Sequence, residues 1–456
     1  MKRPPKPEAR KGSVSTLRFF QLAQKDILSA LPARLYWAWM AEFRTPFFRS
    51  YLCNQPELVD LVLKQNPDAF PKSNRIREGL APLLRNSVFV TNGEVWKKQR
   101  RIIDPAFEGG NLRDIFSAMV AAAEGAVARL KPLANGEAIE TEFHTSHTAA
   151  DVIFRTLFSI PIEHEQASRV FHEFQAHQRM QPVLNLGALV PLPRWFPRFH
   201  RRKTHSTAQN IRALIEAFVQ ERQTQIEDGT APNDLATKIM TTADPVTGDR
   251  FEVEEMIDQI AIFFLAGHET SASALAWALY LLALFPDWQE KVEQECATVI
   301  PSGGPSFSDI SKLRITRDVF REALRLYSPV PMMVREATCP HQFRDRQVPK
   351  GAQIVLSPWH LHRHERLWDN PDDFDPARFG TENGKACLRT AYMPFSAGQR
   401  VCPGAGFAMI EGQLLLAMLV KAYRFEVVEG REPVPVAHLT VRSKDGIWLK
   451  VTPRVG

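Results

Sequence analysis

The feature that most constrains the fold is one long run without proline, Val253–Phe285, which ends immediately before Pro286. A helix of this length would be roughly 50 Å long, enough to cross a whole large domain. Ser271–Phe285 is almost wholly apolar, so a membrane-spanning helix is the alternative. Asp258 and Glu269 oppose it, because an acid at bilayer depth costs about 2.5–3.5 kcal/mol. We therefore expect a buried central helix and no integral membrane segment.

The remaining sequence predicts a mainly α fold with small β-sheets. Residues 110–330 have helical periodicity; Phe116, Met119, Val120 and Ala123, for example, fall at i, i+3, i+4 and i+7 on one face. Short runs rich in β-formers lie at Phe47–Cys53, Gln353–Leu356, Phe425–Val428 and Gly446–Val451.

We expect one domain over residues 15–456, preceded by a disordered basic tail at residues 1–14. Pro182–Pro197 and Glu227–Asp234 are expected to be loops between helices. Leu35–Ala41 is too short to span a bilayer. It is predicted to be a buried amphipathic helix, with a segment resting on a membrane surface as the alternative.

Composition excludes several classes of protein. Of the 456 residues, 44% are hydrophobic and 24% are charged, which excludes a disordered chain and a polytopic membrane protein. The net charge is +6, and part of the excess lies in the first eleven residues, so we expect no nucleic-acid binding. Five cysteines without a Cys-x-x-Cys pair and the lack of an apolar signal segment predict a reducing compartment, and hence a cytoplasmic protein.

The segment Phe395-Ser-Ala-Gly-Gln-Arg-Val-Cys-Pro-Gly404 carries the most chemistry. Cys402 precedes an apolar helical run, and the positive end of a helix dipole there would favour a thiolate. Gly398 and Gly404 would let a flat ligand lie against the backbone, while Arg400 supplies a cation for an anionic group. The alternative, a buried structural cysteine, would not require the flanking residues at fixed spacing.

This segment resembles the cytochrome P450 family, the haem-thiolate monooxygenases, whose signature Phe-x-x-Gly-x-Arg-x-Cys-x-Gly it matches at every fixed position. The resemblance covers roughly residues 30 to 452 and implies the P450 fold, with the long central helix over a haem b. Cys402 would be the ligand of the haem iron, Phe395 would pack near the sulfur, and Arg400 would meet a haem propionate.

Two further motifs have the order and spacing of this family. Trp96 and Arg100, at i and i+4, would hold a haem propionate, and Arg335 is similar to the family's other propionate-binding arginine. A solvated basic helix is the alternative for the first pair. Glu322 and Arg325, at i and i+3, would form a structural triad with Arg378 behind the haem.

The long helix carries a fourth motif, Ala266-Gly-His-Glu-Thr270. Phe263, Ala266, Gly267 and Thr270 share one helix face, where small residues would let a large flat group approach and the Thr hydroxyl can bond the i−4 carbonyl. The resemblance implies that this face is the distal groove: Thr270 would hydrogen-bond dioxygen, and Glu269 would help relay protons from solvent. A helix kinked only for packing is the alternative.

Two other groups of residues need an interpretation. His360, His362 and His364 alternate as zinc ligands on a strand would, but no cysteine or acid completes the set, so we expect structural roles. Phe263, Ala266, Met332 and Met333 are expected to line the substrate pocket together with the loop near residues 80–90, and methionines suit an adaptable shape.

The resemblance implies a monooxygenase that inserts one oxygen atom from O₂ into a lipophilic small molecule, such as a fatty acid or terpenoid. A peroxide-using or isomerising haem-thiolate enzyme is the alternative within the fold, and the Glu269–Thr270 pair disfavours it. A haem sensor or carrier without catalysis would have no need of Thr270. We expect a monomer.

Electrons from NAD(P)H are expected to arrive through a separate ferredoxin or flavodoxin with its reductase, because no flavin or ferredoxin domain follows Gly456. Lys97, Lys98 and Arg101 share the helix of Trp96 and form a basic edge. An acidic ferredoxin is expected to dock on this edge, in an association that salt weakens steeply. A solvated charge run is the alternative.

Overall fold

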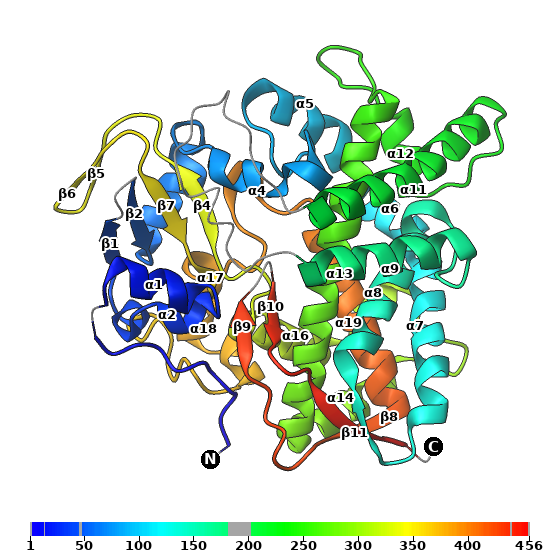
Figure 1. Cartoon of the computed structure of the whole chain (residues 1–456). Coiled ribbons are helices and arrows are strands. Elements are labelled where there is room, and N and C mark those ends of the chain that lie inside the picture. Colours follow the sequence, from blue (N-terminus) through cyan, green and yellow to red (C-terminus); the bar gives the residue numbers. More distant parts are fainter. Residues whose placement is uncertain (1, 13, 45–47, 181–201, 438–439, 455–456) are drawn as a thin grey trace.

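The computed structural model describes residues 2–12, 14–44, 48–180, 202–437 and 440–454. Helices dominate one side of the molecule, and the four-stranded sheet lies on the other (Figure 1). The longer helices are α7 (Phe116–Leu130), α8 (Thr141–Phe158), α9 (Glu165–Met180), α11 (Arg202–Glu227), α13 (Val253–Leu284), α14 (Pro286–Val299), α16 (Arg314–Leu326) and α19 (Ala405–Ala422). Shorter helices include α1 (Thr16–Ala23), α4 (Asn74–Leu84), α5 (Gly93–Ile103), α12 (Leu235–Thr241) and α18 (Glu382–Thr390). The predicted mainly helical fold is confirmed.

The predicted long helix is α13. A capping box formed by Glu252 and Glu255 begins it, which satisfies two of the free N–H groups at its start. Phe285 ends it, and Pro286 opens α14. Most of its side chains are buried, because α8, α11, α16 and α19 pack around it.

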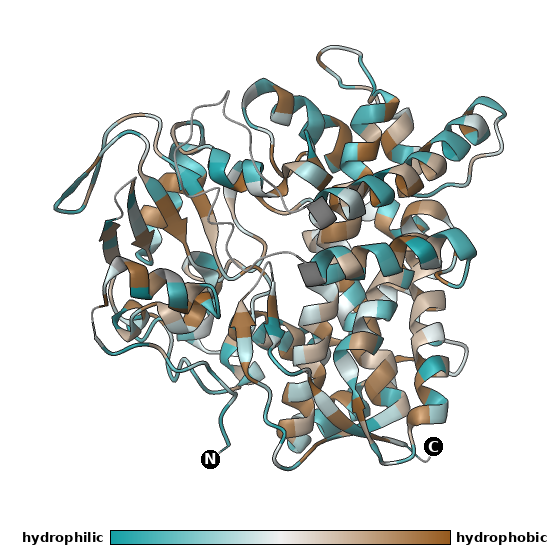
Figure 2. Ribbon diagram, in the orientation of Figure 1, coloured by the Kyte–Doolittle hydropathy of each residue, from teal (hydrophilic) through white to brown (hydrophobic). Residues whose placement is uncertain are grey.

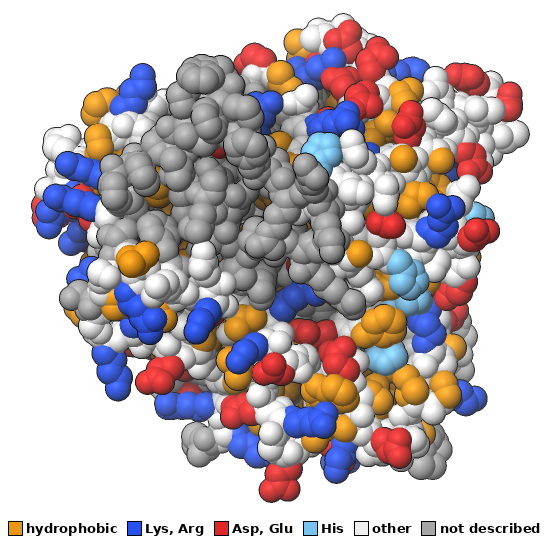
Figure 3. Space-filling view, viewed as in Figure 1, with side chains coloured by type: hydrophobic (Ala, Val, Ile, Leu, Met, Phe, Trp, Pro, Cys, Tyr) orange, Lys and Arg blue, Asp and Glu red, His pale blue; other side chains and the backbone are white. Residues whose placement is uncertain are grey.

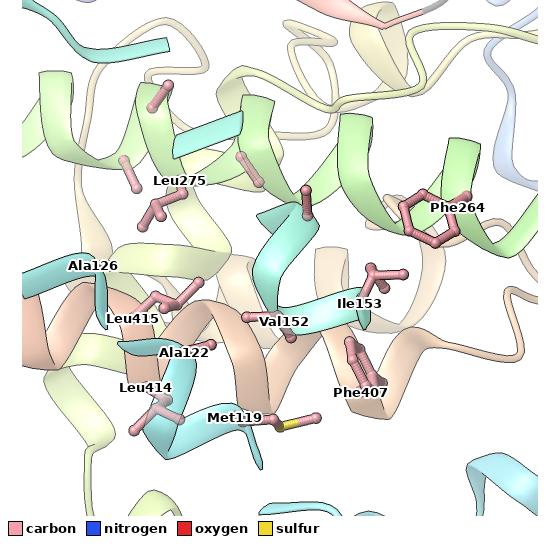
Figure 4. Close-up of a cluster of buried hydrophobic side chains, with 14 of the residues drawn as sticks. Met119, Ala122, Ala126, Val152, Ile153, Phe264, Leu275, Phe407, Leu414 and Leu415 are labelled. Carbon is pink, nitrogen blue, oxygen red and sulfur yellow. The ribbon is translucent and has the colours of Figure 1, made fainter. Parts of the chain in front are cut away.

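The core between these helices is apolar and closely packed. In Figure 4, Met119, Ala122 and Ala126 of α7 and Val152 and Ile153 of α8 meet Phe264 and Leu275 of α13 and Phe407, Leu414 and Leu415 of α19. Small residues on α7 allow the helices to approach, and larger side chains on α13 and α19 fill the space between them.

The sheets are small, as predicted. The largest has the order β1-β2-β7-β4, in which β2 and β7 are parallel and the other neighbours antiparallel. A second sheet has the order β3-β11-β8, and two pairs, β5-β6 and β9-β10, complete the set among the described residues. The strands are β1 (Met40–Arg44), β2 (Arg49–Cys53), β3 (Ala138–Glu140), β4 (Met333–Glu336), β5 (His341–Phe343), β6 (Arg346–Val348), β7 (Gln353–Leu356), β8 (Tyr423–Val427), β9 (Pro435–Ala437), β10 (Val441–Ser443) and β11 (Trp448–Pro453).

Hydropathy follows this arrangement (Figure 2): hydrophilic residues lie on outer helix faces and on the β5–β6 hairpin, and apolar residues face inward. One helix in the described part of the chain, α19, is long and apolar enough to cross a membrane by length and composition, and 56% of it is buried. Its packing against α7, α13, α14 and α16 is that of a core helix. The expected loop at Glu227–Asp234 follows α11, whereas Pro182–Pro197 lies outside the described residues.

Two predictions about the N-terminal region were wrong. Leu35–Ala41 is not a helix: a 3₁₀ turn, Ala33–Tyr36, leads into β1, and Trp37 is 47% exposed. The expected disorder of residues 1–14 does not hold for residues 2–12, where Pro4 and Pro7 are buried and Lys6 pairs with Asp372 at 2.7 Å. Disorder was predicted from the prolines and charged residues of this segment. In the structure, these residues make specific contacts.

Candidate functional site

The cysteine loop is a tight turn that leads into α19. The backbone N–H of Cys402 donates to the carbonyl of Phe395 at 2.9 Å, which closes the loop and places the two predicted residues side by side. A single 3₁₀ turn, Gly398–Arg400, lies between them, and α19 starts at Ala405 with Gly404 at its N-cap. The sulfur therefore lies beside the free N–H groups of a helix start.

The Cys402 side chain is solvent-accessible, yet it lies among enough protein atoms that desolvation raises the pKa of its thiol. A hydrogen bond from the Gly404 backbone and the charges of Arg100 and Lys72 oppose this rise of the pKa. The predicted dipole effect is present but is outweighed by burial, so the thiolate needs a cationic partner such as a metal ion.

The two glycines of the loop have different roles. Gly398 has φ +68° and lies against the backbone carbonyl of Leu63, so no side chain fits there. Its glycine requirement comes from this turn rather than from a flat ligand, which corrects the prediction. A Cβ on Gly404 would lie 3.9 Å from Cys402 Sγ and 4.0 Å from the Phe107 ring, in ordinary contact. Phe107, which sequence reasoning missed, thus lies beside Gly404 of this loop.

Three arginines predicted to bind an anionic group, together with Trp96, converge near this loop. Arg100 donates to the Val401 carbonyl at 2.8 Å and pairs with Asp104 at 2.6 Å. The Arg400 guanidinium lies 4.1 Å from the centre of the Trp96 ring. Arg335 is 4% exposed. Trp96 is buried, so the alternative of a solvated basic helix does not hold for it.

Two of these cations, Arg335 and Arg400, lack compensating acids. Burial lowers the pKa of Arg335 to about 10 and that of Arg400 to about 10, and among the described residues neither makes an ion pair. Lys72, which sequence reasoning missed, lies in the same group: burial first, and then Arg335, Arg400 and Arg100, hold its pKa well below the ordinary value. Cations that are partly removed from water without an opposite charge are costly, so this cluster suits an anionic group.

One part of the α13 surface is accessible to solvent, and we call it the uncovered face of α13. Most of α13 is buried, but Ala266 is exposed and Phe263 and Thr270 are partly exposed, although the helix runs through the middle of the molecule. Thr270 Oγ1 donates to the Ala266 carbonyl at 2.6 Å, the predicted i−4 bond. A Cβ on Gly267, by contrast, would collide with Ile153 of α8. Gly267 therefore packs against α8, and its role in ligand approach stays a prediction.

Glu269 is directed into a polar network. It is 4% exposed; its Oε1 accepts from Thr440 at 2.9 Å and lies 3.3 Å from Arg442 Nε, and its Oε2 accepts from Gln178 at 3.1 Å. These partners come from α9, from β10 and from the residue before β10. The carboxylate is thus held between three segments of the chain.

The comparison with known proteins agrees with this geometry. Residues 47–451 match the family model for cytochrome P450. The chain belongs to the cytochrome P450 family. Curated P450 relatives include a cytokinin hydroxylase of Arabidopsis thaliana, 30% identical over 88% of this chain and 78% of the relative. A cyclooctat-9-en-7-ol 5-monooxygenase of Streptomyces melanosporofaciens is 30% identical over 89% and 86%, and human cytochrome P450 4A22 is 29% identical over 95% and 84%.

P450 enzymes are oxygenases that carry haem b, and the residues of this chain fit that group. A haem presents an iron that requires a thiolate and two carboxylates that require cations. The cysteine loop offers the Cys402 sulfur, while Arg335, Arg400 and Lys72 are cations without acidic partners among the described residues. Ala266 of α13 is exposed, and Phe263 and Thr270 are partly exposed, so this face of the helix is accessible to a ligand.

The predicted P450 triad is present and buried. Arg325 donates two hydrogen bonds to Glu322 at 2.7 and 2.8 Å, and Arg378 Nε donates to Glu322 Oε1 at 2.8 Å. Burial alone would raise the pKa of Glu322, but Arg325 and Arg378 hold it below its ordinary value. Both arginines also donate to backbone carbonyls of residues 369–373, so the triad fixes that irregular segment.

The three alternating histidines serve separate contacts. His360 bonds Ser357 at 2.8 Å, His362 accepts from the Met393 N–H at 2.9 Å, and His364 stacks on Trp39 with ring centres 4.5 Å apart. Burial lowers the pKa of His360 and His362 to about 3 and that of His364 to about 4. All three are neutral structural residues at pH 7.

The residues predicted to line the substrate pocket lie on two elements. Phe263 packs edge-on against Phe107 with ring centres 5.8 Å apart. Met332 and Met333, at the start of β4, are both partly exposed. Met332 packs against the main core and Met333 against the second core around the four-stranded sheet. The two methionines therefore face different surroundings.

Proposed function

We propose that the protein is a monooxygenase that inserts one oxygen atom from O₂ into a lipophilic small molecule, such as a fatty acid or terpenoid. Its haem, held through Cys402, supplies the oxygen-activating chemistry. The observation that supports this function is the Thr270 hydroxyl on the uncovered part of α13, where the accessible side chains Ala266 and Phe263 are apolar. A haem carrier would have no need of a hydroxyl there.

The proposed role of Thr270 is to direct protons. Its Oγ1 donates to the Ala266 carbonyl, and rotation about χ1 would let it donate to a ligand on the uncovered side. Glu269 would pass protons from the surface toward it. Since Arg442 and Gln178 hold the Glu269 carboxylate, this relay requires the side chain to leave at least one of these partners.

The substrate class rests on the apolar lining and on the relatives. Phe107, Phe263 and Met332 are apolar. Two relatives are named for hydroxylation of a cytokinin and for oxygenation of cyclooctat-9-en-7-ol. Titrating a library of fatty acids and terpenoids while recording the low-to-high-spin shift of the haem would identify the substrate.

The first test replaces the proposed iron ligand. Cys402→Ser is expected to abolish the red-shifted Soret band of the reduced carbon-monoxide complex, because the soft thiolate is lost. Cys339→Ser is the control, since Cys339 is also an accessible cysteine and lies in another part of the chain. A Cys402→Ser protein that keeps the band would show that another group binds the iron.

The second test addresses proton delivery. Thr270→Ala is expected to keep haem and substrate binding but to divert electrons from NAD(P)H into peroxide, so less product forms per NAD(P)H. Thr298→Ala is the control, because Thr298 of α14 makes the same i−4 bond, at 2.9 Å to the Gln294 carbonyl, on an exposed surface. Unchanged coupling in Thr270→Ala would make the hydroxyl a purely structural feature.

Electrons are proposed to come through a separate ferredoxin or flavodoxin and its reductase, to a monomeric, cytoplasmic enzyme. The surface beside the cysteine loop supports docking of such a partner. Val401 is 38% exposed and Val95 of α5 is 55% exposed, and the hydrogen bond from Arg100 to the Val401 carbonyl joins α5 to the loop. The cysteine-poor composition supports a reducing compartment.

A further inference from the structure

Lys72, the member of the cation cluster that the sequence did not predict, is held in place by both its backbone and its side chain. Its backbone pairs with Arg335 in an antiparallel bridge, and its neighbours Pro71 and Glu336 share a hydrogen bond of 3.0 Å. The Lys72 ammonium donates to the Phe89 carbonyl at 2.6 Å. Among the described residues no acid pairs with it, so two of its three N–H donors remain for another acceptor.

Asn92 links Lys72 to the cysteine loop. Its Oδ1 accepts from the Lys72 backbone N–H at 3.0 Å and from Arg400 Nη2 at 2.7 Å, and its Nδ2 donates to the Lys72 carbonyl at 3.0 Å. One amide therefore holds residues that are 328 positions apart in the sequence (400 − 72). It fixes the backbone of one cation and the guanidinium of the other.

Asn92 does not make the helix-capping hydrogen bond that is usual at its position. It occupies the N-cap position of α5, where an Asn side chain ordinarily accepts from the helix start and stabilises it by about 1 kcal/mol. No such cap bond is made here. The side chain instead hydrogen-bonds Lys72 and Arg400. The N-terminus of α5, the helix that carries Trp96 and Arg100, is therefore left without this capping bond.

We propose that Lys72 binds a haem carboxylate together with Arg335 and Arg400, and that Asn92 is the positioning residue for Lys72 and Arg400. The group has more positive charge than two carboxylates can balance. Arg100 is already paired with Asp104, which leaves three cations for two haem carboxylates. The net positive charge stabilises the reduced iron relative to the oxidised iron, because reduction lowers the positive charge on the metal.

The test follows haem retention and redox potential in the purified holoprotein. Lys72→Met is expected to speed haem transfer to apomyoglobin by about tenfold or more, the equivalent of one charge-assisted hydrogen bond. It is also expected to lower the equilibrium reduction potential. Lys72→Arg, which keeps the charge, is expected to restore both. Lys97→Met is the matched control, since it removes an ammonium of α5 that pairs with Glu94 on the surface.

Asn92→Ala is expected to speed haem transfer as well, and to lower the potential as the cations move apart. In the double variant with Lys72→Met, the combined effect should be smaller than the product of the two, because part of the effect of Asn92→Ala acts through the Lys72 ammonium. A melting temperature recorded for each holoprotein separates haem release from general unfolding.

Three results would overturn the proposal. Haem transfer and potential of Lys72→Met could match the unchanged protein. Lys97→Met could lower the potential as much as Lys72→Met, which would indicate a general charge effect. Finally, Lys72→Met could retain haem normally but lose affinity for a fatty acid, while its affinity for the methyl ester stays unchanged. The ammonium would then bind the substrate carboxylate.

Discussion

Glu411 is a buried acid that the proposed reaction does not use. It lies on α19, is 1% exposed, and accepts from the Ser271 hydroxyl of α13 at 2.5 Å. Its other oxygen, Oε1, has no partner among the described residues. Burial raises the pKa of Glu411 to about 8, although the Ser271 bond opposes the rise. The folded protein therefore keeps a proton on this carboxyl at neutral pH.

This proton predicts a pH dependence of stability. The unfolded chain releases it near pH 4.5 and the folded protein near pH 8. Between these values the folded state binds more protons, so the free energy of unfolding falls as the pH rises, by up to about 1.4 kcal/mol per pH unit. Glu411→Gln, which cannot ionise, is expected to remove this slope. The measurement is the difference in stability between the two holoproteins at pH 5, 6, 7 and 8.

The difference in stability between the two proteins does not contain the contributions of the other titrating groups, because these are the same in both. Buried His360 and His362, with pKa values of about 3, cost stability only below the ordinary histidine pKa of 6.5, and they do so equally in both proteins. A constant difference across the pH range would contradict the prediction, because it would mean that Glu411 has the same pKa folded and unfolded.

Single residues also show what the sequence could and could not predict. Cys402, Trp96, Arg335 and Arg400 were predicted because they lie in short motifs that resemble those of the P450 family. Lys72 was missed because its neighbours in sequence carry no such motif and its partners lie far along the chain.

The direction that Gly267 faces is a second property that the sequence did not contain. A helix presents side chains in every direction, and only the packing of Ile153 against α13 shows that Gly267 faces α8. The side of a helix that a ligand can reach is a tertiary property, and a short motif does not contain it.

At the scale of an element, α5 differs most from its prediction. Its bases were expected to form a free basic edge. In the structure, Lys97 pairs with Glu94 at 2.9 Å, Lys98 with Asp249 at 3.0 Å, and Arg101 with Asp244 through two bonds of 2.6 and 2.8 Å. Arg101 holds the pKa of Asp244 well below its ordinary value. Two of these acids lie about 150 residues further along the chain, so spacing within α5 could not reveal them.

The pairs predict a shallow salt dependence of electron transfer, in place of the steep one expected from the sequence. Local charges largely cancel, so an acidic ferredoxin gains little from steering. Asp244→Asn with Asp249→Asn would free Arg101 and Lys98. This double variant is expected to be reduced faster at low salt and to slow more steeply between ~0.1 M and ~1 M salt. The measurement is the reduction rate by stopped flow.

The control is a second pair of neutralised acids at the opposite end of the molecule. Glu290→Gln with Glu426→Gln changes the net charge equally, near Arg424 on β8, and α14 and β8 lie far from α5 in Figure 1. Both proteins should keep the carbon-monoxide spectrum. If this control steepened the salt dependence as much, the effect would come from net charge and not from α5.

At the scale of the whole molecule, acidic and basic side chains are interspersed on the face drawn in Figure 3, outside the part drawn in grey. This agrees with the expectation that the +6 net charge does not form a nucleic-acid surface. The charges of the N-terminal segment are used locally: Lys6 pairs with Asp372 and lies over the Tyr36 ring at 4.0 Å. Residues 2–12, which we call the N-terminal strap, therefore lie against the described molecule.

The strap connects distant parts of the fold. The Tyr327 hydroxyl donates to the Pro5 carbonyl at 2.8 Å, and the Tyr327 ring stacks on Trp277 of α13 with centres 3.9 Å apart. Arg10 donates to the Ala30 carbonyl at 2.6 Å. One end of the strap thus contacts a side chain packed on the central helix, and the other contacts α2 (Ile27–Ala30).

These contacts predict that the strap stabilises the fold without taking part in haem binding. Deleting residues 2–12 is expected to lower the melting temperature of the holoprotein by several degrees, because Tyr327 loses its acceptor and Tyr36 is uncovered. Tyr327→Phe alone should cost about 1 kcal/mol, the value of one hydrogen bond. Arg3→Ala is the control, because the Arg3–Asp373 pair is exposed and such pairs contribute little. The carbon-monoxide spectrum should stay unchanged in all three proteins. A deletion variant that melts at the original temperature would mean that residues 2–12 lie on the surface without stabilising it.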